Sequence, residues 1–213
     1  MDKSFAIFDM DGTLVDSMTY WGELATEYLR RRGVKHVPVE VIERIRPMTM
    51  TESSTLFIQE FGLSGTVEEI VAEQNAIMEE HYRKDVPLKP GVREYLAKLA
   101  ARGVTICVAS ATPTTLVEEC LTRLGVGDRF RFFISCESVG TGKNRPDVYH
   151  AAAKRLDAEP EDIAVYEDAW YAINTAKAAG YYVVGVYDEA TRSRWEQIKA
   201  LSDEYIENWE EAL

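Results

Sequence analysis

Five short apolar runs in this chain show no alternation of polar and apolar residues, and they constrain its fold more than any other feature. A strand with one face in water alternates, whereas a strand covered on both faces is apolar throughout. The runs are rich in β-branched and aromatic residues and occupy Phe5–Asp9, Val104–Ala109, Phe132–Cys136, Ile163–Glu167 and Tyr182–Val186. They predict a mostly parallel sheet buried between layers of helices.

Helical patterns separate the later apolar runs. Several of these segments are followed directly by glycine, which is a common stop signal at the end of a helix. They occupy Val92–Arg102, Thr114–Leu124, Asp147–Leu156 and Ala169–Ala179. Strands that alternate with helices in this way predict a Rossmann-like α/β fold with right-handed crossovers.

One long stretch after the first run, residues 17–86, breaks this rhythm. It contains four helical patterns and no convincing strand: Met18–Arg32, Val39–Arg46, Thr51–Phe61 and Val67–Lys84. About 70 helical residues are far more than one crossover needs. We interpret residues 17–86 as an inserted α-helical cap domain, with residues 1–16 and 87–213 forming the α/β core. The last segment, Thr191–Leu213, is expected to form one or two amphipathic helices.

Composition and charge exclude several classes of function. The net charge of −12 argues against nucleic acid as a partner, because phosphate backbones are bound by basic surfaces. No apolar run approaches membrane-spanning length, and the N-terminal run is too short for a signal peptide. We expect a cytoplasmic protein that binds neither nucleic acid nor membrane, with a monomer as the default state. The three cysteines lack metal or redox spacing, and Cys107 and Cys136, which lie in apolar runs, are expected to be buried packing thiols.

Two acids, Asp9 and Asp11, follow the first apolar run and lead into Gly12. Ligands of open parallel sheets bind at the carboxyl ends of the strands, so both acids are expected at a binding crevice. One carboxylate can attack phosphorus, and the other can protonate a leaving oxygen. Gly12 would let the backbone approach a phosphate. The alternative is an ordinary Asp-Gly turn.

Two further positions could bind an anion. The Ser110 hydroxyl and the amide of Ala111 follow a strand and face a helix start, where anions bind. Alternatively, Ser110 or Thr112 caps the next helix. Lys143 lies in a glycine-bearing loop and could neutralise a phosphate and the attacking carboxylate. The alternative for Lys143 is a solvated loop lysine.

The acidic pair Glu167-Asp168 ends the fourth apolar run. Paired acids at the end of a buried strand are costly unless they hold a cation or other partners. Together with Asp9 they would form an oxygen-rich site suited to Mg²⁺. Such a cation would also reverse the local field for an anionic substrate in this acidic chain. The alternative is that Asp168 caps the following helix.

These segments resemble, nearly from end to end, the motifs of the haloacid dehalogenase-like hydrolases with a helical cap. DMDGTLVDS at Asp9–Ser17 matches the first motif, and Ser110, Lys143 and Glu167-Asp168 match the other three. The resemblance implies a sheet of order 5-4-1-2-3, Asp9 as nucleophile and Asp11 as acid and base. It also implies Mg²⁺ held by Asp9, Asp168 and the Asp11 carbonyl with Glu167 nearby, and a phosphoryl group held by Ser110 and Lys143. Asn144, Ala169 and Ala172 depart from the usual pattern in the loops.

The resemblance favours a Mg²⁺-dependent phosphatase that hydrolyses a small phosphorylated metabolite through an aspartyl-phosphate. A β-phosphoglucomutase-like sugar-phosphate mutase shares every core motif, but no histidine of the kind those mutases use lies around Trp21. A non-enzymatic phosphate-binding protein is the alternative from a different class. A dehalogenase is disfavoured because Asp11 is present, and a phosphonatase because the cap lacks a suitable lysine. In the cap, Arg46, Met48 and Thr49 are candidates for substrate contact.

Overall fold

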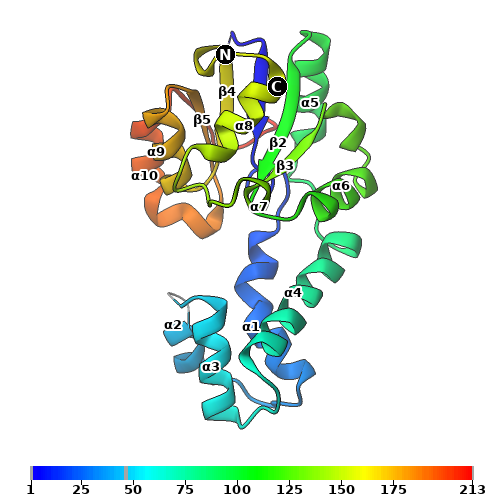
Figure 1. The fold of residues 1–213 in the computed structure, drawn as a ribbon, viewed down its shortest axis with the longest axis vertical. Helices are drawn as coiled ribbons and strands as arrows, with labels where there is room; N and C mark the ends of the chain where they lie inside the picture. The colour runs from blue at the N-terminus through cyan, green and yellow to red at the C-terminus, as the bar shows by residue number, and fades with distance from the viewer. Residues whose placement is uncertain (1, 46–47, 213) are drawn as a thin grey trace. The chain divides into compact units, whose positions relative to one another are not determined.

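The computed structural model describes residues 2–45 and 48–212. The chain divides into two compact units, of which one combines Met1–Met18 with Val86–Leu213 and the other is Thr19–Asp85. Figure 1 shows the sheet in the first unit and, over the described residues of the second unit, helices without strands. Among the described residues, no helix is long and apolar enough to pass through a bilayer.

The first unit contains a parallel sheet of order β3-β2-β1-β4-β5-β6. Its strands are β1 (Phe5–Phe8), β2 (Thr105–Ser110), β3 (Phe133–Ser135), β4 (Ile163–Glu167), β5 (Tyr182–Val186) and β6 (Glu204–Ile206). The predicted order of five strands is confirmed, because β1 lies between β2 and β4. All strand pairs in this sheet are parallel, as the unbroken apolar runs predicted.

The sixth strand corrects the prediction of one or two amphipathic helices over Thr191–Leu213, because only part of that segment is helical. The segment forms the end of a 3₁₀-helix (Glu189–Arg194), then α10 (Trp195–Leu201), and then β6 beside β5. Asp203 anchors the new strand, because its amide donates to Val183 O and its carboxylate accepts from Val183 N. β6 is only three residues long, with Tyr205 exposed and Ile206 buried. Such a short pattern does not distinguish an edge strand from a helix by periodicity.

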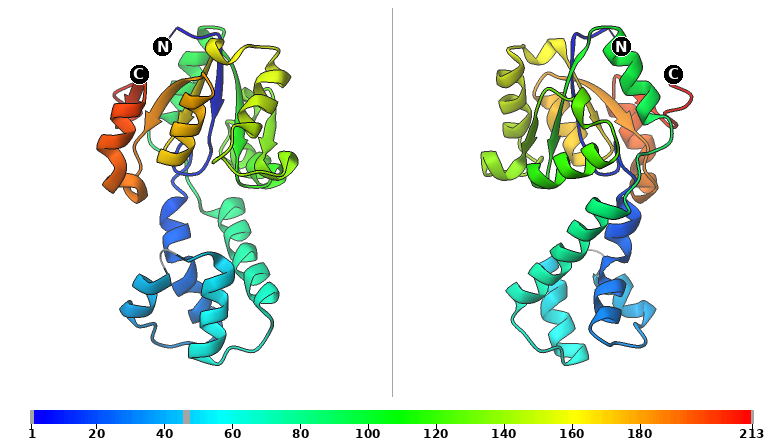
Figure 2. Two further views of the ribbon diagram at one scale, coloured as in Figure 1. Left: turned by 60° about the vertical axis from the view of Figure 1, so that its left-hand side comes forward. Right: turned by 90° about the vertical axis from the view of Figure 1, so that its right-hand side faces the viewer.

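Helices cover both faces of the sheet (Figure 2). On one face, α8 (Asp147–Leu156), α9 (Trp170–Ala178) and α10 pack in one cluster with β-strand residues such as Ile7 and Val165. The opposite face carries α5 (Val92–Ala101) and α6 (Thr114–Arg123). There Phe8 stacks on Tyr166 with ring centroids 4.2 Å apart, and the Tyr95 and Tyr166 hydroxyls lie 2.8 Å apart. Both faces of the sheet are therefore buried, which explains its continuous apolar strands.

The described residues of the second unit form most of α1 (Met18–Arg31) together with α2 (Val39–Ile45), α3 (Met50–Phe61) and α4 (Val67–Lys84). Tyr28, Phe57 and Ile70 are among its fully buried side chains. Reciprocal capping boxes begin α3 at Thr49 and α4 at Thr66, where a side-chain oxygen satisfies an amide that the helix leaves free. The helical interpretation of this stretch thus has a physical basis in both packing and capping.

Candidate active site

The site lies where three neighbouring strands end. Asp9 follows β1, Ser110 is the last residue of β2, and Glu167 is the last residue of β4. β1 pairs in parallel with both β2 and β4, so the carboxyl ends of all three strands meet at one edge. The sheet thus brings together residues that are about 100 or more positions apart in the sequence.

A tight turn holds the two aspartates after β1. The Asp9 amide donates to Tyr166 O at 2.9 Å, and the Met10 carbonyl accepts from the amides of Leu14 and Val15. Gly12 has a φ of +77°, and a Cβ atom there would lie 2.5 Å from Asp168 Oδ2. Only glycine fits this backbone conformation and this close approach without strain.

A cluster of three buried carboxylates forms the centre of the site. Asp9, Glu167 and Asp168 each place one oxygen atom within 4.8 Å of the others. Lys143 inserts its ammonium among them and pairs with Asp9 Oδ1, and with Glu167 Oε1 at 2.5 Å. The Tyr149 hydroxyl donates to the same Glu167 oxygen at 2.9 Å. Lys143 is only 5% exposed, so it is not a solvated loop lysine.

The electrostatics of this cluster follow from its burial and crowding. Burial raises the pKa of Asp9 to about 8, with the charges of Glu167 and Asp11 adding to it and Lys143 opposing it. Burial and the neighbouring carboxylates of Asp9 and Glu167 also hold the pKa of Asp168 well above its ordinary value. Burial works against the charged form of Lys143, but the Asp9 and Glu167 carboxylates outweigh it and raise the lysine pKa. The single ammonium of Lys143 therefore does not neutralise the three carboxylates around it.

The residues present fit a divalent cation. Three ionised carboxylates and one ammonium have a formal charge of −2, which one Mg²⁺ ion would neutralise. The donor atoms are carboxylate oxygens, the type that Mg²⁺ prefers. A Cβ atom at Gly12 would come within 2.5 Å of Asp168 Oδ2, so the glycine keeps this oxygen clear of a neighbouring side chain. The expected metal ligands Asp9, Asp168 and Glu167 are thus brought together, and Asp11 lies next to them on the chain.

Hydroxyl groups on both sides orient the Asp11 carboxylate. Ser17 Oγ donates to Oδ1 at 2.7 Å, and Thr112 Oγ1 donates to Oδ2 at 2.8 Å. Ser110 Oγ lies 3.5 Å from the same Oδ2 and accepts the Thr112 amide at 3.0 Å. Sequence reasoning placed Ser110 at the site but assigned no catalytic contact to Ser17 or Thr112. Thr112 follows Ser110 by two residues, and this spacing was the available signal.

The capping alternatives for these polar residues do not hold in the structure. α6 begins after Pro113, and neither Ser110 nor Thr112 supplies a side-chain cap to it. α9 begins after Ala169, again without a side-chain cap from Asp168. Cys107 and Cys136 are free and buried, as expected, and so is Cys120. The polar side chains at the strand ends therefore face one another rather than the helix termini.

The candidate substrate contacts of the helical unit have different surroundings. Met48 lines a cavity between the helices of that unit. Thr49 is the N-cap of α3, where its hydroxyl donates to Glu52 Oε2 at 2.8 Å. Arg46 lies outside the described residues. The structure thus gives Thr49 a capping function that the sequence analysis did not consider.

Comparisons with known proteins agree with this geometry. Residues 5–180 match the family described as haloacid dehalogenase-like hydrolase. Hexitol phosphatase B of Escherichia coli K12 is 29% identical over 82% of this chain and 79% of its own length. The β-phosphoglucomutase of Bacillus subtilis is also 29% identical, over 84% of this chain and 81% of its own length.

Two other similarities extend over nearly the whole chain. A bifunctional riboflavin kinase/FMN phosphatase of Arabidopsis thaliana is 28% identical over 97% of this chain, which spans only 56% of that longer protein. A solved structure from Thermotoga maritima, assigned as a β-phosphoglucomutase, superposes with a TM-score of 0.82 at 24% identity. That alignment covers 98% of this chain and 95% of the other, and it shows the shared fold.

The chain belongs to the haloacid dehalogenase-like hydrolase family, which confirms the resemblance read from its four motifs. Several relatives are phosphatases that act on small phosphorylated compounds, including hexitol, carbohydrate and glycerol-3-phosphate phosphatases. They support the prediction of a phosphoric monoester hydrolase.

Proposed function

We propose that the protein is a Mg²⁺-dependent phosphatase that hydrolyses a small phosphorylated metabolite through an aspartyl-phosphate on Asp9. The observation that carries this proposal is the buried cluster of Asp9, Glu167 and Asp168 around Lys143. A buried cluster with an excess of carboxylates destabilises a fold, so its presence points to a functional role. Phosphoryl transfer to a carboxylate requires such a cluster together with cations that offset the charge of the ester.

The nucleophile in this proposal is the Asp9 carboxylate. Attack on phosphorus forms a new bond between phosphorus and one Asp9 oxygen, while the bond to the ester oxygen breaks. Lys143, which already pairs with Asp9, remains beside the developing charge on the phosphoryl oxygens. The Ser110 hydroxyl and the Ala111 amide would hold the phosphoryl group at the end of β2. A magnesium ion held by Asp9, Asp168 and Asp11, with Glu167 nearby, would supply further charge neutralisation.

Asp11 is the proposed general acid and base. Its proton would pass to the departing alcohol oxygen, and the resulting carboxylate would take a proton from the water that hydrolyses the aspartyl-phosphate. Ser17 and Thr112 hold this carboxylate from two sides, so its orientation is set before substrate binds. The charge of −12 is compatible with an anionic substrate because the cations are local to the site.

A panel of phosphorylated metabolites, with p-nitrophenyl phosphate as a general substrate, tests this proposal. We expect release of phosphate with Mg²⁺ and none with EDTA, and restored activity when Mg²⁺ is added back. The Asp9→Asn variant should lose turnover while its circular dichroism spectrum stays that of the wild type. Activity that survives EDTA would refute the metal requirement, and activity in Asp9→Asn would refute the nucleophile. No turnover of any substrate would favour a non-enzymatic phosphate-binding protein.

A sugar-phosphate mutase is the second candidate, favoured by the similarity to the B. subtilis β-phosphoglucomutase. The identity to that enzyme equals the identity to hexitol phosphatase B, so similarity does not separate the two reactions. Incubation with β-glucose 1-phosphate separates them. A mutase would form glucose 6-phosphate, whereas a phosphatase would form glucose and inorganic phosphate.

A further inference from the structure

The indole of Trp209 contacts the turn that follows β1, residues 9–15, which we call the catalytic turn. Its Nε1 donates to Thr13 O at 3.2 Å, a hydrogen bond between residues 196 positions apart in the sequence. Trp209 is only 3% exposed, and a buried indole N–H usually has a partner of this kind. The family match covers residues 5–180, so Trp209 lies outside the four motifs. A segment of the sheet unit beyond those motifs is thus bonded directly to the catalytic turn.

The same indole packs against residues that directly precede two carboxylates of the site. Its ring centroid lies 6.4 Å from that of Phe8 and 5.9 Å from that of Tyr166. Phe8 is followed by Asp9, and Tyr166 is followed by Glu167. The Tyr166 carbonyl also accepts the Asp9 amide at 2.9 Å. One side chain therefore packs against both β1 and β4, immediately beside the carboxylate cluster.

The backbone around Trp209 is held by contacts that do not involve the indole. Gly91, the residue before α5, has a φ of +83°, and a Cβ atom there would lie 2.5 Å from the Glu210 amide nitrogen. Further along α5, Lys98 Nζ donates to Ala212 O at 3.1 Å. These contacts fix the segment after β6 against α5. We therefore expect the segment to keep its place when the indole is replaced by another ring.

The hydrogen bond to Thr13 matters because the catalytic turn is buried. The amides of Leu14 and Val15 both donate to Met10 O within the turn, at 2.9 and 3.0 Å. Thr13 is 0% exposed, so its carbonyl cannot replace the indole by bulk water unless the turn moves, and leaving it without a donor is unfavourable. A displacement of about 1 Å at a reacting group can lower a rate by about 100-fold. The contact with Trp209 is therefore placed to limit such displacements.

We propose that Trp209 is a positioning residue that holds the catalytic turn and so sets the orientation of Asp9 and Asp11. The inference rests on the proposed phosphatase function and adds to it a residue outside the family motifs. Trp209 acts through the Thr13 carbonyl rather than on the substrate. Its replacement should therefore affect the chemical step more than substrate binding.

Two substitutions of Trp209 separate the hydrogen bond from the packing. Trp209→Phe removes the N–H donor and keeps an aromatic ring. Trp209→His keeps a five-membered ring whose Nε2 occupies the ring position of the indole nitrogen, and so can restore the donor. Trp195→Phe is the matched control, because Trp195 is also buried and its Nε1 donates to Glu207 Oε1 at 3.1 Å, away from the catalytic turn.

Amide hydrogen exchange of the full-length protein, followed by NMR, tests the positioning without any catalytic step. In Trp209→Phe the amides of Leu14 and Val15 should exchange about tenfold faster than in the wild type, relative to the amide of Val108. Val108 is hydrogen-bonded inside the sheet and reports on global unfolding. Trp195→Phe should leave this ratio unchanged. Turn amides that exchange no faster than in the wild type, or that accelerate only as much as Val108, would overturn the proposal.

Steady-state kinetics with p-nitrophenyl phosphate and Mg²⁺ complete the test. Trp209→Phe should lower kcat about tenfold and change KM less than about twofold, and Trp209→His should have a higher kcat than Trp209→Phe. Trp195→Phe should keep the wild-type kcat. An unchanged kcat in Trp209→Phe, an equal loss in Trp195→Phe, or no recovery in Trp209→His would overturn the proposal. Absence of turnover by the wild type would refute the phosphatase function separately, since hydrogen exchange reports on the turn alone.

Discussion

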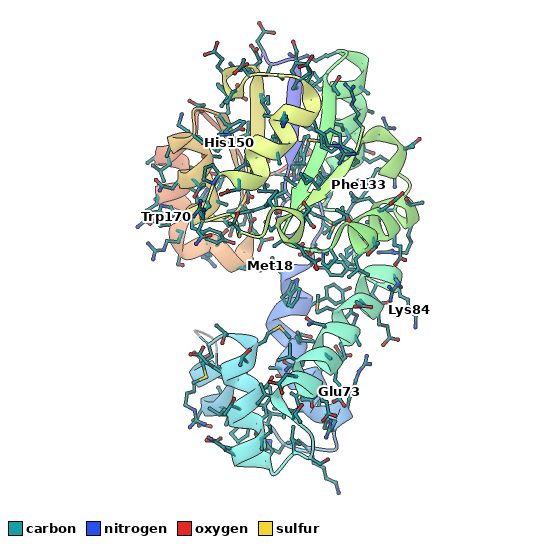
Figure 3. The ribbon with its side chains drawn as sticks, in the orientation of Figure 1. Met18, Glu73, Lys84, Phe133, His150 and Trp170 are labelled. Carbon is teal, nitrogen blue, oxygen red and sulfur yellow. The ribbon has the colours of Figure 1, made fainter. Side chains whose placement is uncertain are left out.

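The two units use acidic and basic side chains in opposite ways. In the sheet unit, three carboxylates are buried around Lys143 and outnumber the available positive charge. In the helical unit, acids and bases pair with one another at the surface, as Lys84 does with Glu80 and Arg32 with Glu73. Figure 3 labels Glu73 and Lys84, two of these side chains on α4.

This difference distinguishes exposed ion pairs, which affect stability only slightly, from buried carboxylates that are placed to bind a ligand or to react. An exposed ion pair such as Lys84 with Glu80, four residues apart on one helix, contributes little because water screens it. A buried carboxylate without enough partners raises the free energy of the folded state, and it persists only where a ligand or reaction needs it. We assign the cluster at Asp9 to the second kind, as part of the proposed catalytic site, and the pairs along α4 to the first.

Replacing Lys143 should have the largest effect, on both activity and stability. Lys143→Ala leaves Asp9 and Glu167 buried without their ammonium partner, which typically costs about 3 to 5 kcal/mol of unfolding free energy. Loss of charge neutralisation should lower kcat by about 10³-fold or more. Urea denaturation and steady-state kinetics measure the two effects.

Lys84→Ala is the matched control in the helical unit. Its partner Glu80 is exposed and also pairs with Arg31, and alanine is at least as good a helix former as lysine. We expect no measurable change in the denaturation midpoint or in kcat. A comparable loss of stability in the two variants would break the distinction between buried and exposed charges.

Removing the Thr112 hydroxyl should have an intermediate effect, confined to catalysis. Thr112→Val keeps the shape of the side chain but loses the 2.8 Å hydrogen bond to Asp11. We expect kcat to fall about tenfold with KM nearly unchanged, because a misoriented acid and base affects proton transfer rather than binding. Thr112→Ser should restore most of kcat, and failure of this rescue would show that the methyl group, not the hydroxyl, matters.

The smallest measurable effect is expected from replacing His81, a residue of the helical unit that lies between two carboxylates. Burial works against the charged form of His81, but the carboxylates of Glu27 and Asp85 outweigh it and raise the pKa of the imidazole above 6.5. A group with a raised folded-state pKa stabilises fully below its unfolded value and loses that contribution as the pH rises through the folded value.

The difference in unfolding free energy between the wild type and His81→Gln should therefore be largest below about pH 6.5 and shrink at higher pH. Denaturant titrations of both proteins measure this difference across a pH series that stays above the titration range of Glu27, because burial opposes but the hydrogen bonds from His81 and Arg31 lower the pKa of that carboxyl. kcat should be unaffected by the substitution at any pH. A stability difference that grows with rising pH would contradict the assignment.

Much of the fold could be predicted because its signals are local. The bounds of β4 and β5 agree with the apolar runs. The bounds of α4 also agree with the prediction, since a capping box at Thr66 begins this helix and Asp85 ends it. β6 escaped prediction because its pairing depends on Asp203 bonding to Val183, twenty residues away. Periodicity in three residues does not carry that information.

The candidate site likewise contains some residues that could be predicted from the sequence and others that could not. Asp9, Lys143 and Asp168 could be singled out because each has a recognisable motif at a strand or loop end. The contact of Thr112 with Asp11 joins residues 101 positions apart, and that of Tyr149 with Glu167 uses a residue that resembles helix core in the sequence. Such partners become visible only when the sheet brings the strand ends together.

The position of the phosphoryl group during turnover tests the central claim most directly. The Asp11→Asn variant should accept a phosphoryl group from p-nitrophenyl phosphate, an ester with a good leaving group, but hydrolyse the aspartyl-phosphate slowly because the general base is missing. After acid quench and proteolysis, mass spectrometry should find one phosphoryl group on Asp9, and none in the Asp9→Asn variant. A burst of p-nitrophenol without labelled Asp9, or a phosphoryl group on another residue, would contradict the assignment of Asp9 as the nucleophile.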